Sequence, residues 1–153
     1  MSQSISSGKH HEEEYAWFKK QFRKTMEFLY QNGKPTLSLQ FVLNRYIQEH
    51  RQQGRQTLLD AFGWSDKRLD RYLSGEVPSV KNYKTLIKIC IILKLGYEDA
   101  WQLMINCGYP PNDLDRDINK RAHYSILKHL DWYDTIEDWN SFLRDMKCKT
   151  LDE

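Results

Sequence analysis

Apolar side chains recur every three or four residues along most of this chain, the spacing that places them on one face of an α-helix. No stretch has the strict alternation of apolar and polar residues that is typical of a half-buried strand. The pattern therefore predicts an all-α fold. The helices are expected over residues 12–31, 37–52, 55–62, 65–74, 79–95, 97–108, 113–130 and 135–146.

The segment from Arg55 to Ser79 is predicted to contain two short helices joined by a tight turn. Gly63 can adopt the left-handed conformation that ends a helix, and Ser65 is a suitable N-cap for the next one. That second helix should end at Gly75. The inward faces are apolar, with Leu58, Leu59 and Phe62 on the first helix and Leu69, Tyr72 and Leu73 on the second. This order of signals is typical of a helix-turn-helix.

At these residues the chain resembles the lambda repressor-like family of DNA-binding domains. The resemblance rests on Gly63-Trp64-Ser65, Leu69, Arg71-Tyr72, Gly75 and Pro78-Ser79, with Ser79 expected to cap a further helix. It covers residues 37–109 and implies a five-helix domain whose second motif helix enters the major groove of DNA. An N-terminal tail and amphipathic helix in residues 1–36 and two helices in residues 110–153 would flank that domain.

The resemblance also implies roles for particular side chains. Base edges would be read by Ser65, Asp66, Lys67, Arg68 and Arg71. Phosphates would be contacted by Arg55, Lys81 and Lys84. The implied function is that of a sequence-specific, double-stranded DNA-binding transcriptional regulator of bacterial or phage type. One such module buries little surface on DNA, so a homodimer on a pseudo-palindromic site is expected.

The charge of the chain is distributed unevenly. The net charge is +2 overall, but residues 1–96 carry +7 and residues 97–153 carry −5. This polarity suits a protein with one surface that faces an anion and another that faces a different partner. Trp17 and Phe28 fall off the apolar stripe of their helix, so they are candidates for a dimer or partner contact.

A second reading of the same residues is a protein-interaction module built on a helix-turn-helix scaffold. Asp66 and Asp70 place negative charge on the helix that would approach phosphates, and many Trp and Tyr residues lie outside the core stripes. An antitoxin, or an inhibitor of a nucleic-acid-processing enzyme, would fit this composition. Both readings remain open at this point because a fold does not fix a function.

Other classes of function find little support in the sequence. A glycine-rich phosphate loop, a His-x-x-x-His pair and a nucleophile elbow are absent, so we expect neither an enzyme nor a cofactor or metal site. The three cysteines are widely spaced and are expected to be reduced thiols. No apolar run approaches the roughly 18–20 residues that span a bilayer, and no signal peptide is recognisable, so a cytoplasmic protein is expected.

Overall fold

The computed structural model describes residues 13, 15–17, 20 and 37–153. The chain divides into two units, residues 1–36 and 37–153, so residues 110–153 belong to the same unit as residues 37–109. The residues described in the first unit are helical. All regular structure over the described residues is helical, without strands, which confirms the all-α prediction. Within that part of the chain, every helix is too short or too polar to cross a membrane.

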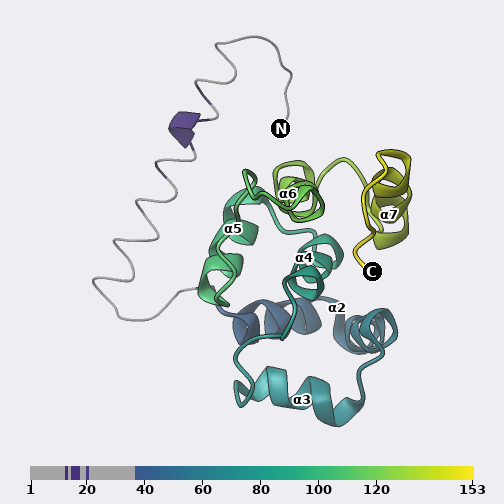
Figure 1. Cartoon of the computed structure of the whole chain (residues 1–153). Helices are drawn as coiled ribbons and strands as arrows, with labels where there is room; N and C mark the ends of the chain where they lie inside the picture. Colours follow the sequence, from purple (N-terminus) through teal and green to yellow (C-terminus); the bar gives the residue numbers. More distant parts are fainter. Residues whose placement is uncertain (1–12, 14, 18–19, 21–36) are drawn as a thin grey trace. The chain divides into compact units, whose positions relative to one another are not determined.

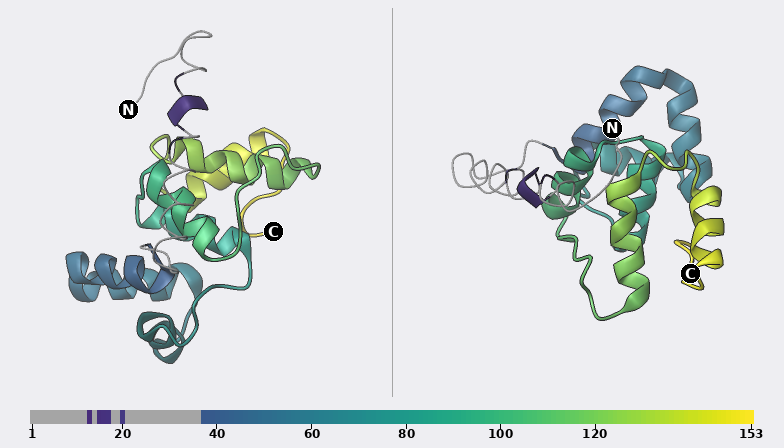
Figure 2. Two further views of the ribbon diagram at one scale, coloured as in Figure 1. Left: turned by 90° about the vertical axis from the view of Figure 1, so that its left-hand side faces the viewer. Right: turned by 90° about the horizontal axis from the view of Figure 1, so that it is seen from above.

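The second unit is organised around one apolar helix (Figure 1). Its elements are α2 (Leu39–Phe62), α3 (Asp66–Ser74), α4 (Tyr83–Ile92), α5 (Tyr97–Asn106), α6 (Ile118–Ser125), the 3₁₀ turn η1 (Ile126–His129) and α7 (Ile136–Asp145). Helix α4 contacts α5, α6, η1 and α7, and five of its ten residues, all apolar, are buried. Helix α3 lies across α4 from α6 and α7 in both Figure 1 and Figure 2, and it packs against α2.

Helix α2 consists of two segments, residues 39–50 and 52–62, separated by a kink. Arg51 breaks the helix there with φ 59° and ψ −139°. The sequence placed this break at Gln53-Gly54, and that prediction was wrong. Gly54 is helical and buried, and a Cβ atom at this position would lie 2.8 Å from the Cβ of His50. Glycine is therefore required because the two segments approach closely here.

The turn between α2 and α3 agrees with the predicted capping signals. Gly63 ends α2 in the left-handed conformation at φ 65°, and the Oγ of Ser65 accepts a hydrogen bond from the backbone N–H of Arg68. Gly75 ends α3 at φ 82°. The two glycines adopt the left-handed conformation that ends a helix, and Ser65 supplies the hydrogen-bond acceptor that starts one.

The start of α4 differs from the prediction. The sequence named Ser79 as the N-cap, but the helix begins after Asn82, whose side chain accepts a hydrogen bond from the backbone N–H of Lys84. The hydroxyl of Ser79 donates to the carbonyl oxygen of Cys107 at 3.0 Å instead. Serine and asparagine are both common N-cap residues. Here Asn82 caps the helix, and the hydroxyl of Ser79 takes part in a tertiary hydrogen bond.

The C-terminal helices are shorter than predicted. Asp117 caps α6, so the helix starts at Ile118 rather than near Asp113, and Ile118 is exposed. Thr135 caps α7, because its side-chain oxygen accepts a hydrogen bond from the backbone N–H of Asp138. Met146 is exposed because it follows the last helical turn and the chain then reverses at Lys147, which has φ 62°.

After α7 the chain folds back as a C-terminal strap, residues 147–153. Leu151 is buried, and its backbone N–H donates to the Oδ1 of Asn140 at 2.8 Å. Asp152 accepts from the amide nitrogen of Asn140 and pairs with the Nζ of Lys88 at 2.7 Å. The strap therefore ties α7 to the central helix α4.

The buried His123 of α6 also connects the C-terminal strap to α4. The Nε2 of His123 lies 2.7 Å from the carbonyl oxygen of Lys149, and its Nδ1 lies 2.8 Å from the Oη of Tyr83. A carbonyl oxygen only accepts, so in the neutral ring Nε2–H donates to Lys149 and Nδ1 accepts from Tyr83. Burial lowers the pKa of His123 from its ordinary value of 6.5, and the nearby charge of Lys84 acts in the same direction, against opposing contributions from the Lys149 carbonyl and Asp117.

We expect the free energy of unfolding to decrease as the pH falls below 6.5, the ordinary histidine pKa. The unfolded chain binds a proton first, because the folded state holds His123 neutral, and the loss continues until the pH passes the lowered folded-state pKa. Urea unfolding at a series of pH values measures this effect. His123→Gln should flatten the profile between pH 7 and about 5, whereas a control with His50→Gln, an exposed site, should retain it. An unchanged profile in His123→Gln would refute the assignment.

Candidate nucleic-acid interface

Aromatic side chains fill the space beneath the turn between α2 and α3. The ring of Trp64 lies 4.6 Å from that of Phe62 and 4.7 Å from that of Tyr72, measured between centroids. Trp64, Leu69 and Tyr72 are buried. Offset aromatic contacts of this kind fix the position of one helix relative to the next. The outer face of α3 is therefore presented on a rigid support.

The C-terminal end of α3 is held by the first segment of α2. The side-chain amides of Gln40 and Asn44 both donate to the carbonyl oxygen of Leu73, at 3.1 and 2.9 Å. A Cβ atom at Gly75 would lie 2.7 Å from the Oε1 of Gln40, the end of a flexible side chain that can move aside, so glycine is needed there for its positive φ of 82°. These two amides were not predicted from the sequence. Their spacing of four residues on one helix is the only signal that could have marked them.

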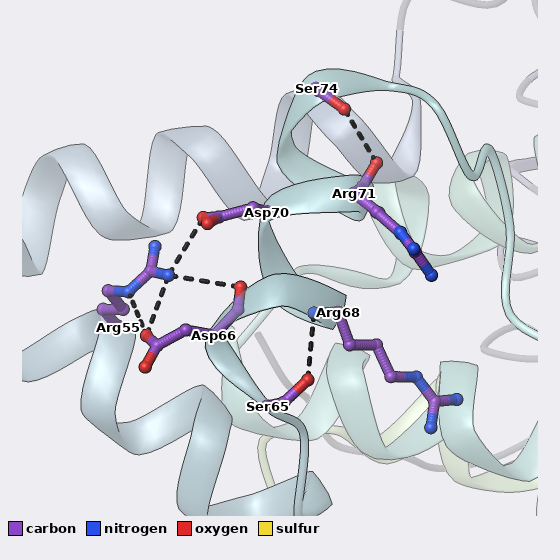
Figure 3. A network of polar contacts seen from close by, with 7 residues as sticks. All are labelled: Arg55, Ser65, Asp66, Arg68, Asp70, Arg71 and Ser74. Atoms are coloured by element: carbon purple, nitrogen blue, oxygen red, sulfur yellow. Dashed lines mark hydrogen bonds and ion pairs between the residues drawn. The ribbon is translucent and has the colours of Figure 1, made fainter.

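Helix α3 has three faces of different character. Leu69 and Tyr72 point inward. Asp66 and Asp70 point to one flank, toward Arg55 of α2, whereas the side chains of Arg68 and Arg71 extend on the other side (Figure 3). The helical period places Lys67, Arg71 and Ser74 on the outermost face, opposite the buried one, and all three are exposed.

One guanidinium binds both carboxylates of α3. The Nη2 of Arg55 lies 2.9 Å from the Oδ1 of Asp66 and 2.9 Å from the Oδ1 of Asp70. Its Nε also donates to the Oδ1 of Asp66 at 3.1 Å. The hydrogen bonds to Asp70 and Asp66 raise the pKa of Arg55. Arg55 and Asp66 were predicted to contact phosphate and bases respectively, and the structure places them against each other.

The two arginines on the other side of α3 are held more loosely. The guanidinium of Arg68 lies 5.9 and 6.0 Å from the ring centroids of Trp64 and Tyr72, a cation–π arrangement. The Nε of Arg71 lies 3.7 Å from the Oε2 of Glu76, and both side chains are exposed. An exposed ion pair of this kind contributes about 0–1 kcal/mol, so a ligand can displace Glu76 at small cost.

Of the other residues predicted to contact DNA, Ser65 and Lys67 lie at the start of α3, and Lys81 and Lys84 lie at the start of α4. Ser65 is exposed, with its Oγ already used as the helix cap, and Lys67 and Lys81 are exposed. Lys84 is half-buried near the strap, where its charge lowers the pKa of Asp152 after the larger effect of Lys88. The structure therefore brings Arg55 and the predicted base-reading residues together at α3, while Lys84 lies near the C-terminal strap.

Two further predicted positions concern partner contacts. Trp17 is half-buried, and Phe28 lies outside the described residues. Across the described part of the chain, no three His, Cys, Asp or Glu side chains converge in a way that could hold a metal ion.

Comparison with family models, with curated proteins and with solved structures gives no match for this chain. What its surface binds is therefore inferred from the side chains of α3 and the residues that support them.

Proposed function

We propose that this protein is a sequence-specific double-stranded DNA-binding regulator of bacterial or phage type, with a lambda repressor-like helix-turn-helix in residues 37–109. In this proposal α3 lies in the major groove and reads base edges. The observation that carries the proposal is the outer face of α3, where Lys67, Arg71 and Ser74 are exposed on a helix fixed at both ends.

These side chains have the chemistry that the major groove requires. Guanine presents two acceptors, O6 and N7, and arginine or lysine donates to both. The N–H fork of Arg71 is suited to this pair of acceptors, and Lys67 lies four residues earlier on the same face. Lys81 is an exposed cation that remains our candidate for a phosphate contact. Arg68, predicted to read a base edge, is exposed as well and extends from α3 on the same side as Arg71. Lys84 stays a weaker candidate because of its position beside the strap.

We also propose that the protein binds DNA as a two-fold dimer. A single recognition helix contacts too few base pairs for tight specific binding, and two copies address two half-sites. Light scattering at micromolar concentration is expected to give twice the chain mass of 18.4 kDa. A monomer mass under conditions in which the protein still binds DNA specifically would contradict the dimer.

The expected signature of the DNA-binding function is a steep salt dependence. Each phosphate contact adds about 0.9 to the slope of log affinity against log salt concentration, so four to eight contacts in a dimer give roughly −4 to −7. Fluorescence anisotropy with a labelled random duplex, from about 50 to 200 mM salt, measures this slope. A flat dependence, or no binding at the lowest salt, would argue against the proposal.

A second candidate function is binding of a protein partner, and one surface favours it. Trp132 and Met146 are large apolar side chains that are exposed. Trp132 packs edge-on against Phe142 with 6.2 Å between ring centroids, and the exposed carboxylates of Asp138 and Asp145 lie on the same helix as Phe142. Exposed apolar side chains with a polar rim are typical of protein-interaction sites. This candidate takes precedence if duplex DNA does not bind at low salt.

A further inference from the structure

The interaction of Arg55 with the two aspartates of α3 has consequences for what this site can read. Arg55 comes from the second segment of α2, 11 residues before Asp66 and 15 before Asp70. Its side chain is 21% exposed, against 73% and 62% for the two aspartates. Arg55 is therefore the least exposed member of the cluster, and both carboxylates point toward its guanidinium (Figure 3).

The geometry sets the direction of both carboxylates. Each aspartate offers its Oδ1 to the same Nη2, and the Nη2 of Arg55 also approaches the backbone oxygen of Asp66 at 3.4 Å. Hydrogen bonds between ionised partners are about twice as strong as neutral ones. The two acidic side chains are thus drawn to the α2 flank of α3, away from the side occupied by Arg71.

A free carboxylate on this helix would change the chemistry of the site. An aspartate accepts from the N4 amino group of cytosine, and the N6 amino group of adenine is a donor of the same kind. It also repels phosphate. Lys67 and Arg71 instead donate, which suits guanine O6 and N7. The direction of Asp66 and Asp70 therefore decides whether the helix offers acceptors or only donors to the groove.

We infer that Arg55 is a specificity-determining residue of the proposed DNA site: by holding Asp66 and Asp70 aside, it leaves base reading to Lys67 and Arg71 and restricts the site to acceptor-rich edges such as guanine. The inference rests on the proposed function. It assigns Arg55 a positioning role in place of the phosphate contact that the sequence resemblance implied.

The test is a set of variants assayed for affinity and for base preference by competition among duplexes from a random library. Arg55→Gln should lower affinity by about fivefold, as expected for the loss of one nearby charge, and should create a new preference for a donor base. Asp66→Asn with Asp70→Asn should leave the preferred sequence unchanged in the parent. The same pair of changes in the Arg55→Gln background should restore the parental preference, which makes the effects non-additive.

Two further variants separate positioning from a phosphate contact. Arg55→Lys keeps the charge, but an ammonium group lacks the planar fork of N–H donors, so we expect the new base preference with a smaller loss of affinity. Arg45→Gln is the matched control, because it removes an arginine from the first segment of α2. The Nη2 of Arg45 lies 3.9 Å from the Oδ2 of Asp99 in α5. Arg45→Gln should leave the preference unchanged. Thermal unfolding of each variant identifies any that fail to fold, and Arg55→Lys keeps the inference testable if Arg55→Gln is one of them.

Three outcomes would overturn the inference. A changed preference in the Asp66→Asn, Asp70→Asn protein would mean that the carboxylates already read bases. A uniform loss in Arg55→Gln, with the salt slope reduced by about 0.9 and no restoration by the asparagines, would make Arg55 a phosphate contact. Absence of duplex binding by the parent would remove the proposed function itself, and the inference with it.

Discussion

Alanine at both Lys67 and Arg71 is expected to remove sequence preference and to weaken binding to the best site by about 2–6 kcal/mol. The estimate follows from about 1–3 kcal/mol of discrimination for each good contact to a base edge. Both side chains are exposed on the outer face of α3, so the variant should fold normally. Fluorescence anisotropy on the preferred duplex and on a scrambled duplex measures both effects.

The matched control replaces one arginine and one lysine at the end of a different helix, α7, with alanine. Arg144 and Lys147 are exposed at the end of α7, on the other side of α4 from α3. Alanine at both should leave the preference intact and should change affinity only through the loss of overall charge. If the Lys67, Arg71 variant binds like the parent while the control does not, α3 is not the reading element.

The largest expected effect on stability is at Leu69, the residue by which α3 is anchored to the core. Its side chain is 0% exposed, and truncation of a buried leucine to alanine costs about 2–5 kcal/mol because the cavity left behind relaxes only partly. Urea unfolding of Leu69→Ala should show this loss as a lower midpoint. DNA affinity should fall with it, since α3 loses its support.

Leu114 provides the control for this change. It is a leucine of the same unit that is 79% exposed, and Leu114→Ala should change the free energy of unfolding by no more than about 0.5 kcal/mol. A loss below 1 kcal/mol for Leu69→Ala would be inconsistent with the packing of α3 described above.

Local signals in the sequence were sufficient to place most helices and several of their ends. Ser65, Gly63, Gly75 and Thr135 act as the capping types predict, because a cap depends on residues within one turn. The kink of α2 was misplaced because Gly54 serves a close approach between two segments rather than a helix end. Periodicity cannot distinguish these two uses of glycine.

The helix that carries the candidate site was predicted from the sequence, whereas the contacts between its side chains and the rest of the unit were not. The helix α3 was predicted from its periodicity and its caps, but Arg55 meets Asp66 and Asp70 across a turn of the chain, and only the tertiary structure brings them together. Lys88, on the same helix as Lys84, pairs with Asp152 of a strap that lies 64 residues later in the sequence. Such contacts leave no periodic pattern in the sequence.

Titration of the isotope-labelled protein with a short duplex, followed by NMR, tests the central proposal most directly. At about 50 mM salt, where phosphate contacts are strong, the amide signals of Lys67, Arg71 and Ser74 should shift first, and those of Trp132 and Met146 should stay in place. Raising the salt to about 200 mM should reverse the shifts. No shift on α3 at low salt, or shifts confined to Trp132, Met146 and their neighbours, would contradict the assignment of α3 as the DNA-reading helix.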